Sequence, residues 1–138
     1  MTKYQSLEER QEKNEDSMIS KAPARELEGM WDIFFENHKK AKRPHRIINI
    51  ILKEPKFEKL TVISIENQGV ERLFEFLKPC KRLQALFVTG NRIITRDLKY
   101  LHHIKSLRKL DLSHNGIHFL PEREMMTDLI KLEFLFLH

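Results

Sequence analysis

A frame of four apolar residues and one amide recurs along the chain from residue 60 onward. The stretch LRKLDLSHNGI has apolar side chains at offsets 0, 3, 5 and 10 from its first leucine, and Asn115 at offset 8. The stretches LQALFVTGNRI and LTVISIENQGV fill the same positions, with Asn91 and Gln68 at offset 8. The complete copies begin at residues 60, 83 and 107, and a partial fourth begins at residue 132, so the periods are 23, 24 and 25. A fixed period of this length predicts stacked structural repeats.

The frame describes a short strand followed by a sharp turn. Alternate residues of a strand point to opposite faces, so offsets 3 and 5 point into a core and offset 4 points outward. The turn leaves backbone N–H and C=O groups inside the protein, where an unpaired group costs roughly 1–3 kcal/mol. An Asn side chain both donates and accepts hydrogen bonds. We therefore predict that Gln68, Asn91 and Asn115 form a structural amide ladder along successive turns.

The frame resembles the leucine-rich repeat family, of the intracellular type that lacks cysteine-rich caps. Three complete copies carry the resemblance, and Gln68 is their one departure from Asn at offset 8. The resemblance implies an α/β solenoid with short parallel strands on its concave face. Return segments with helical spacing of apolar residues, VERLFEFLKPCKR, DLKYLHHIKS and FLPEREMMTDLIK, would form the convex face. The resemblance also implies a scaffold or adaptor that binds other proteins.

The fourth repeat stops early. Its frame begins at Leu132, and the chain ends at His138, at offset 6, before the turn and its amide. We expect a fragment, a truncated isoform or an incomplete gene model; the alternative is self-association of the open strand edge with another chain. The stretch FLPEREMMTDLIKLEFLFLH is similar to a repeat of the leucine-rich repeat and IQ motif proteins associated with cilia. That similarity implies a piece of a larger cytoskeletal or ciliary protein.

The sequence divides the chain into three parts. Residues 1–20 are polar and lack apolar periodicity, which indicates disorder or a frayed helix. Residues 21–58 form a pre-repeat region, and residues 60–138 form the repeats. In PARELEGMWDIFFENHKK, apolar residues around Trp31 recur at steps of three and four after Pro23, which predicts a helix. This helix and the apolar segment HRIINIILKEP would cap the solenoid core; the alternative is that the Trp31 face binds a partner.

The composition predicts a single domain in the cytoplasm or the nucleus. The chain has 138 residues, of which 41% are hydrophobic and 33% charged. The single cysteine, Cys80, excludes an internal disulfide and favours a reducing compartment. No apolar run approaches the roughly 18 residues of a membrane span, and the N-terminal stretch lacks a signal-peptide core. We therefore expect no membrane span, and the ciliary resemblance suggests cytoskeletal or ciliary association.

One basic run stands out from an evenly mixed charge distribution with a net charge of +5. The stretch KKAKRPHR holds Lys39, Lys40, Lys42, Arg43 and Arg46. A run of this kind can contact nucleic acid or another anionic surface, and more commonly it is a solvated linker. Nucleic-acid or anionic-surface binding through this run is therefore the alternative functional hypothesis.

The concave face is the predicted interaction site. The outward strand positions and the turns beyond them supply the candidate contacts Ser64, Phe87, Arg92, Lys109, Asp111, His114, Phe134 and Phe136. Exposed aromatic side chains on rigid strands suit the binding of another protein, and charged neighbours would select it. The alternative is that the pre-repeat helix, or chain beyond His138, covers these aromatic side chains.

The sequence predicts neither a catalytic centre nor a metal site. His114 and His118 lie across a predicted turn without further ligands. The chain has four glycines and no phosphate-binding loop, and no pattern pairs a nucleophile with a base. We predict a non-enzymatic protein without a cofactor or a small-molecule substrate, whose partner is another protein.

Overall fold

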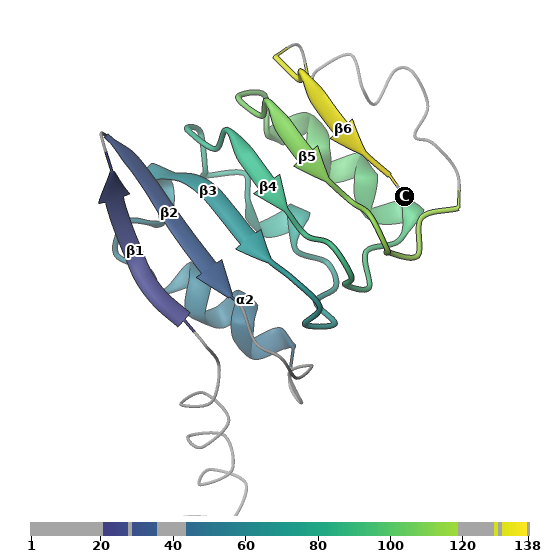
Figure 1. Cartoon of the computed structure of the whole chain (residues 1–138), viewed down its shortest axis with the longest axis horizontal. Coiled ribbons are helices and arrows are strands. Elements are labelled where there is room, and N and C mark those ends of the chain that lie inside the picture. Colours follow the sequence, from purple (N-terminus) through teal and green to yellow (C-terminus); the bar gives the residue numbers. More distant parts are fainter. Residues whose placement is uncertain (1–20, 28, 36–43, 119–128, 130, 138) are drawn as a thin grey trace, which may run out of the picture.

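Six strands form one sheet in the computed structural model, which describes residues 21–27, 29–35, 44–118, 129 and 131–137. Each strand lies beside its neighbours in sequence, from β1 at one edge to β6 at the other (Figure 1). β1 is antiparallel to β2, and the pairs from β2 to β6 are parallel. The strands are β1 (Lys21–Leu27), β2 (Met30–Phe35), β3 (Leu60–Ile65), β4 (Ala85–Phe87), β5 (Lys109–Asp111) and β6 (Phe134–Phe136).

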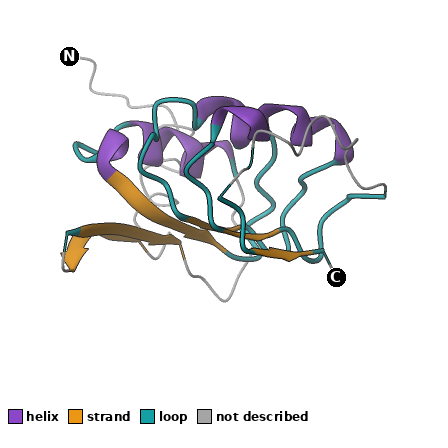
Figure 2. Cartoon of the chain, turned by 90° about the horizontal axis from the view of Figure 1, so that it is seen from above, coloured by secondary structure: helices purple, strands orange, loops and turns teal. Residues whose placement is uncertain are grey.

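The helical segments lie in one layer over a single face of the sheet (Figure 2). The returns predicted from VERLFEFLKPCKR and DLKYLHHIKS are present as 3-10 segments, whereas FLPEREMMTDLIK lies almost entirely outside the described residues. The described helical segments are α2 (His45–Leu52), η1 (Phe57–Lys59), η2 (Phe74–Phe76) and η3 (Thr95–His103). The structure is therefore an α/β arrangement of a mainly parallel sheet and short helical returns.

The strand register aligns the frame of each repeat with the next. Ile63, Leu86 and Leu110 occupy one row across β3, β4 and β5, and each is 0% exposed. Leu135 continues the row on the edge strand β6, where it is 37% exposed. The offset-3 residue of every complete repeat therefore points into the core, as the alternation of a strand predicts.

The core fills the space between the sheet and the helical layer. Ile47 and Ile51 on α2, Phe74 on η2, and Leu98 and Leu101 on η3 are almost fully buried against the inward rows of the sheet. Burying one such side chain contributes about 1.5–3 kcal/mol to folding. The apolar spacing of the return segments is thus explained by packing.

The prediction of a helix after Pro23 is wrong for the described residues, because Lys21–Leu27 and Met30–Phe35 form a β-hairpin. The burial of side chains alternates along the second strand of this hairpin. Ile33 and Phe35 are buried, whereas Asp32 is only partly buried. Both periodicities fit the sequence, so tertiary context decides between them. A strand here covers the edge of β3, whose backbone groups a helix would leave unpaired.

A bulge joins the hairpin to the first repeat. Trp31 pairs with Leu60, but Asp32 pairs with Val62, so Thr61 is the extra residue on β3. The Thr61 hydroxyl accepts the Trp31 N–H at 2.8 Å and donates to the Trp31 carbonyl at 3.1 Å. The Thr61 side chain thus replaces part of the ladder that the bulge interrupts.

Candidate interaction surface

The face of the sheet opposite the helical layer carries the outward strand positions, and we call it the open face. Its first row is Asp32, Val62, Ala85, Lys109 and Phe134, and its second row is Phe34, Ser64, Phe87, Asp111 and Phe136. Val62, Ala85 and Ser64 are small, and the larger side chains of Phe34, Phe87, Lys109 and Phe134 stand around them. This order of sizes leaves a shallow depression.

The depression on the open face is a hollow of about 380 Å³. Its apolar lining includes Met30, Val62, Ala85, Phe87 and Phe134. Phe134 is 49% exposed and Phe87 is partly buried. Solvent-accessible aromatic and aliphatic groups around a hollow on a rigid sheet can pack against a side chain of another protein.

Two charged side chains lie between the aromatic ones. The Lys109 ammonium stands 5.5 Å from the centre of the Phe134 ring, within the range of a cation–π contact. Asp111 holds its own turn, because one carboxylate oxygen accepts the Ser113 N–H at 2.9 Å. Phe136, in the next strand beside Asp111, is 41% exposed. Lys109 and Asp111 therefore place a positive and a negative group beside the aromatic side chains of the open face.

The other predicted contact residues lie in three different places. Ser64 lies on the open face but is only 5% exposed, at the floor of the face. Arg92 instead lines a separate hollow beside α2, together with His45 and Glu75. His114 is exposed in the turn after β5. The strand residues are thus brought together, and Arg92 is not part of their hollow.

Sequence reasoning missed the contribution of β2 to this surface. Asp32 and Phe34 extend the two outward rows by one strand, and Met30 lines the hollow. The helix prediction hid them, because it placed these residues around a cylinder. The alternation from Trp31 to Phe35 was the signal that could have revealed the strand.

Asn91 connects the turns of two adjacent repeats. Its side-chain oxygen accepts the N–H groups of Gln68 and Val70 at 3.2 and 3.1 Å. Its side-chain nitrogen donates to the carbonyls of Ile65 and Val88, both at 2.8 Å. One buried side chain thus satisfies backbone groups that belong to two turns.

Asn115 has the equivalent contacts one repeat later. Its oxygen accepts the Ile93 N–H at 2.9 Å, and its nitrogen donates to the carbonyls of Val88 and Leu112, both at 2.9 Å. Gln68 is fully buried at the first turn and donates to the Glu66 carbonyl at 2.9 Å. The three amides stand in consecutive turns at the carboxyl end of the strands.

A left-handed residue precedes each of these amides. Asn67, Gly90 and His114 all lie at offset 7, with φ of 55°, 71° and 57°. Glycine adopts this conformation without cost, and Asn and His are among the side chains found there more often than others. The residue types at offset 7 are therefore a turn signal in the sequence, and the frame of apolar positions and amides does not include it.

Burial sets the chemistry of the one cysteine. Cys80 is buried, and burial, followed by the charge of Glu58, raises the pKa of its thiol to about 12. A thiol with this pKa holds almost no nucleophilic thiolate at neutral pH. Among the residues that the structure describes, no group of three or more His, Cys, Asp or Glu could hold a metal ion.

The structure describes only part of the basic run and tests the membrane prediction only for the described residues. Residues 39–43 lie outside the described residues, and Arg46 is partly buried on α2. Within the described part of the chain, no helix has the length and apolar character needed to cross a membrane.

Comparison with known proteins shows similarity in structure alone. No protein-family model and no curated protein sequence matches the chain. Internalin C2 from Listeria monocytogenes matches 59% of this chain and 34% of its own chain, with 24% identity and a TM-score of 0.51. The chain therefore spans about a third of that protein. The actin-binding site 2 of leiomodin-1 matches 74% of this chain and 67% of its own, with 14% identity and a TM-score of 0.53.

Both neighbours support a leucine-rich repeat relationship, as the frame predicted. At these identities the likeness concerns the fold alone. The more specific resemblance to leucine-rich repeat and IQ motif proteins stays a prediction.

Proposed function

We propose that the chain is a non-catalytic protein–protein interaction module that holds its partner on the open face. One observation carries the proposal: Phe134 and Phe136 are 49% and 41% exposed, and they share a rigid sheet face with Phe87 and its hollow. Clustered exposed aromatic residues are typical of the energetically dominant part of a protein interface. The expected partner inserts an apolar side chain into the hollow and presents opposite charges to Lys109 and Asp111.

The proposal includes an architecture. The coils from residue 60 onward would form a leucine-rich repeat solenoid with the open face as its concave wall, and residues 21–58 would cover its first coil. The sheet supports this arrangement, because β2 pairs in parallel with β3 and its Ile33 and Phe35 are buried in the shared core. A rigid strand surface limits the conformational entropy lost on binding, which favours affinity.

Actin is the first partner to test. The leiomodin-1 neighbour is described as an actin-binding site, and a cytoskeletal partner in the cytoplasm agrees with the ciliary resemblance of the last repeat. Co-sedimentation with filamentous actin would measure this directly. Pelleting that depends on the open face would identify the partner class, whereas absence of pelleting would exclude actin and leave the choice of partner to the next experiment.

The interaction surface itself is tested with a matched pair of variants. Phe87→Ser combined with Phe134→Ser removes the two rings at the hollow. Phe76→Ser removes a ring of similar exposure (38%) from the helical layer. A binder retained by the wild-type chain is purified, and its affinity for each variant is measured by calorimetry. We expect the open-face variant to bind at least about tenfold more weakly. Truncating an important interface residue typically costs more than about 1 kcal/mol of binding free energy, and about 1.4 kcal/mol corresponds to a tenfold change in affinity.

The same experiment can refute the proposal. Equal loss of affinity in the Phe76→Ser variant would place binding elsewhere or indicate a general effect of lost stability. Unchanged affinity in the open-face variant would exclude this surface. Binding that disappears when salt is raised would instead support the alternative of nucleic-acid or anionic-surface contact through Lys39–Arg46.

A further inference from the structure

Basic residues recur in the turn before each repeat strand, at the opposite end of the strands from the amide ladder. Lys59, Arg82 and Lys131 directly precede offset 0, and Lys81 and Lys105 lie two residues before it. Neighbouring strands of a sheet are about 4.8 Å apart. Positive side chains are therefore repeated across the amino ends of β3 to β6 at short intervals.

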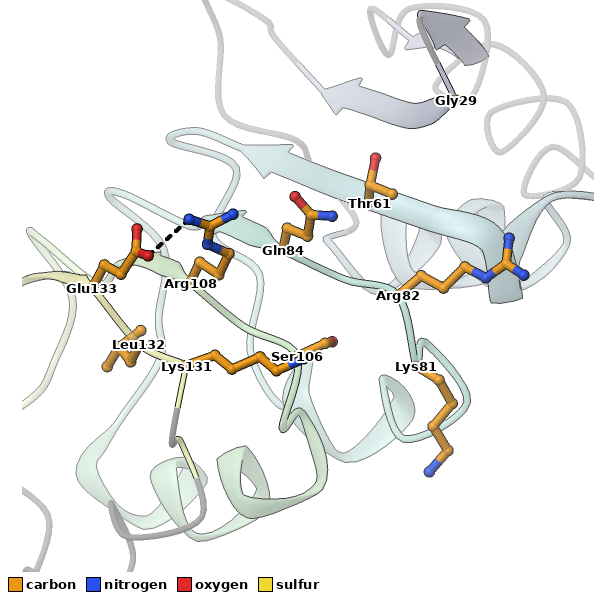
Figure 3. A pocket seen from close by; sticks show the side chains of 10 residues that line it. All are labelled: Gly29, Thr61, Lys81, Arg82, Gln84, Ser106, Arg108, Lys131, Leu132 and Glu133. Carbon is orange, nitrogen blue, oxygen red and sulfur yellow. Dashed lines mark hydrogen bonds and ion pairs between the residues drawn. The ribbon is translucent and has the colours of Figure 1, made fainter.

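Two adjoining hollows lie along this edge, with volumes of about 700 and 310 Å³. Lys81 and Ser106 line both hollows, so the two hollows lie side by side. In Figure 3, Lys81 and Arg82 leave one turn in different directions, with Lys81 directed toward the helical layer. We call the two hollows together the cationic groove; its basic residues are Lys78, Lys81, Arg82, His103, Lys105, Arg108 and Lys131.

The groove has a large excess of positive charge. Glu133 is the acidic residue among the described residues that line it, and it pairs with Arg108 at 2.7 Å (Figure 3). Within the described part of the chain, no ion pair neutralises the remaining Lys and Arg side chains of the groove. All of these side chains are exposed. Their charges are therefore available to a ligand.

The positive charges of the groove also act on His103. Its pKa is lowered from the ordinary value, first by partial burial and then by the positive charges of His102, Lys78, Lys81 and Lys105. The imidazole ring of His102 lies 3.8 Å from that of His103. A bound anion would offset this repulsion.

We propose that the cationic groove binds an acidic polypeptide segment of a partner protein. The groove crosses the ends of successive strands, so it presents a line of cations and not a single point. Acidic side chains three or four residues apart on a helix are about 5–6 Å from each other, close to the strand spacing. This site adjoins the open face, because Gln84, Arg108 and Glu133 line both its larger hollow and the hollow of the open face. The other basic residues of the groove do not line the open-face hollow, so the proposal does not depend on the function proposed for that face.

Single-stranded nucleic acid fits the groove less well. Proteins that bind single strands combine positive charge with aromatic side chains on which the bases stack. No Phe, Tyr or Trp is among the described residues that line either hollow. The uncharged lining residues include Gln84 and Ser106, and Leu132 adds an apolar contact. These groups suit the mixed surface of a peptide.

Binding of a fluorescent ten-residue peptide of alternating Glu and Ala tests the proposal by anisotropy. Lys81→Glu combined with Lys105→Glu reverses two charges of the groove. Lys53→Glu combined with Lys99→Glu makes the same change in net charge at exposed positions that line neither hollow. We expect the groove variant to bind at least tenfold more weakly than wild type and the control variant to bind within threefold of wild type.

Three further readouts separate the ligand classes. In the complex the His103 pKa, followed by NMR, should rise toward its ordinary value, because carboxylates offset the neighbouring cations. A peptide with Gln in place of Glu should not bind. Tighter binding of an oligothymidylate of equal charge, or of phosphatidylserine vesicles, through the same two lysines would overturn the polypeptide assignment.

Equal weakening by the control variant would also overturn the proposal, since it would mean a non-specific charge effect. Failure of the Glu peptide to bind at low salt would do the same. The Phe87→Ser and Phe134→Ser changes should leave peptide binding unchanged, so this site and the open face can fail independently.

Discussion

β2 and β3 both place apolar side chains in the core, but the sequences that follow the two strands differ. Ile33 and Ile63 stand in one row, Phe35 and Ile65 in the next, and all four are buried. After β3, Gln68 and the Asn91 side chain bond the backbone of the turn. Since Ile33 pairs with the offset-3 residue Ile63, Met30 corresponds to offset 0. Offset 8 is then His38, so the sequence after β2 has no amide at this position.

This difference separates two roles of the repeat frame. The alternating apolar residues are sufficient to place a strand in the sheet and in the core. The amide and the left-handed residue before it shape the turn, and they make a repeat recognisable in sequence. A segment whose sequence lacks the amide at offset 8 can still belong to the sheet, as β2 does.

The largest effect should come from Phe35→Ala. Phe35 is 1% exposed and belongs to the same core as the repeats. Replacing a buried Phe by Ala typically costs about 3–5 kcal/mol of the free energy of unfolding. Urea denaturation measures it, and Phe34→Ala, on the open face of the same strand, is the control with a smaller cost. Similar small costs for both variants would show that β2 is only loosely attached to the repeats.

A smaller effect is expected from Asn91→Ala, which leaves backbone groups of two turns without partners. The free energy of unfolding should fall by roughly 1–3 kcal/mol. Asn115→Ala should cost less, because Asn115 is less buried than Asn91. Asn49→Ala on the exposed side of α2 should be nearly neutral. If the urea midpoint of Asn91→Ala equals that of the parent chain, the amide does not stabilise the turns.

Two glycine substitutions compare a repeat turn with the hairpin turn. Gly90 and Gly29 have similar φ, 71° and 81°, so Ala should cost roughly 1–2 kcal/mol at either position. A Cβ on Gly90 would lie 1.9 Å from the Asn67 side-chain oxygen, whereas a Cβ on Gly29 would have nothing within 4 Å. Gly90→Ala should therefore lower the thermal midpoint further. Equal shifts would mean that the Asn67 side chain moves aside freely.

The smallest effect on stability should come from Phe134→Ser. Phe134 is half exposed at the edge of the sheet, so the free energy of unfolding should change by less than about 1 kcal/mol, near the range of ordinary surface substitutions. Partner binding, measured in the same preparation, should nevertheless fall. A loss of several kcal/mol in stability would show that the ring serves the fold and would weaken its assignment to the open face.

The repeats could be predicted from sequence because the spacing of apolar residues in each copy indicates which side chains point into the core. Leu83, Leu86 and Val88 lie where the frame places them, and the strand register follows from aligning the copies. The hairpin could not be predicted in this way. The stretch around Trp31 satisfies helical spacing and strand alternation equally, and the exposed edge of β3, which decides between them, is a tertiary feature.

The residues of the candidate surfaces could likewise be predicted where local strand geometry decides, and could not where tertiary structure decides. The outward strand residues could be predicted, since alternation fixes their direction. The position of Arg92 beside α2 could not, because it depends on how the turn after β4 leaves the sheet. The cationic groove was also missed: its lysines are separated in sequence, and only the stacking of the turns brings them together.

The central claim is that β2 and the repeats form one cooperative sheet. Native-state hydrogen exchange tests it most directly through two amides that join them: the Trp31 N–H, which donates to the Thr61 hydroxyl, and the Glu66 N–H, which donates to the Phe35 carbonyl. We predict opening free energies within about 1 kcal/mol of those of the Gln84 and Val88 amides inside the repeats. Rapid exchange of the Trp31 and Glu66 amides while the Gln84 and Val88 amides stay protected would contradict the claim.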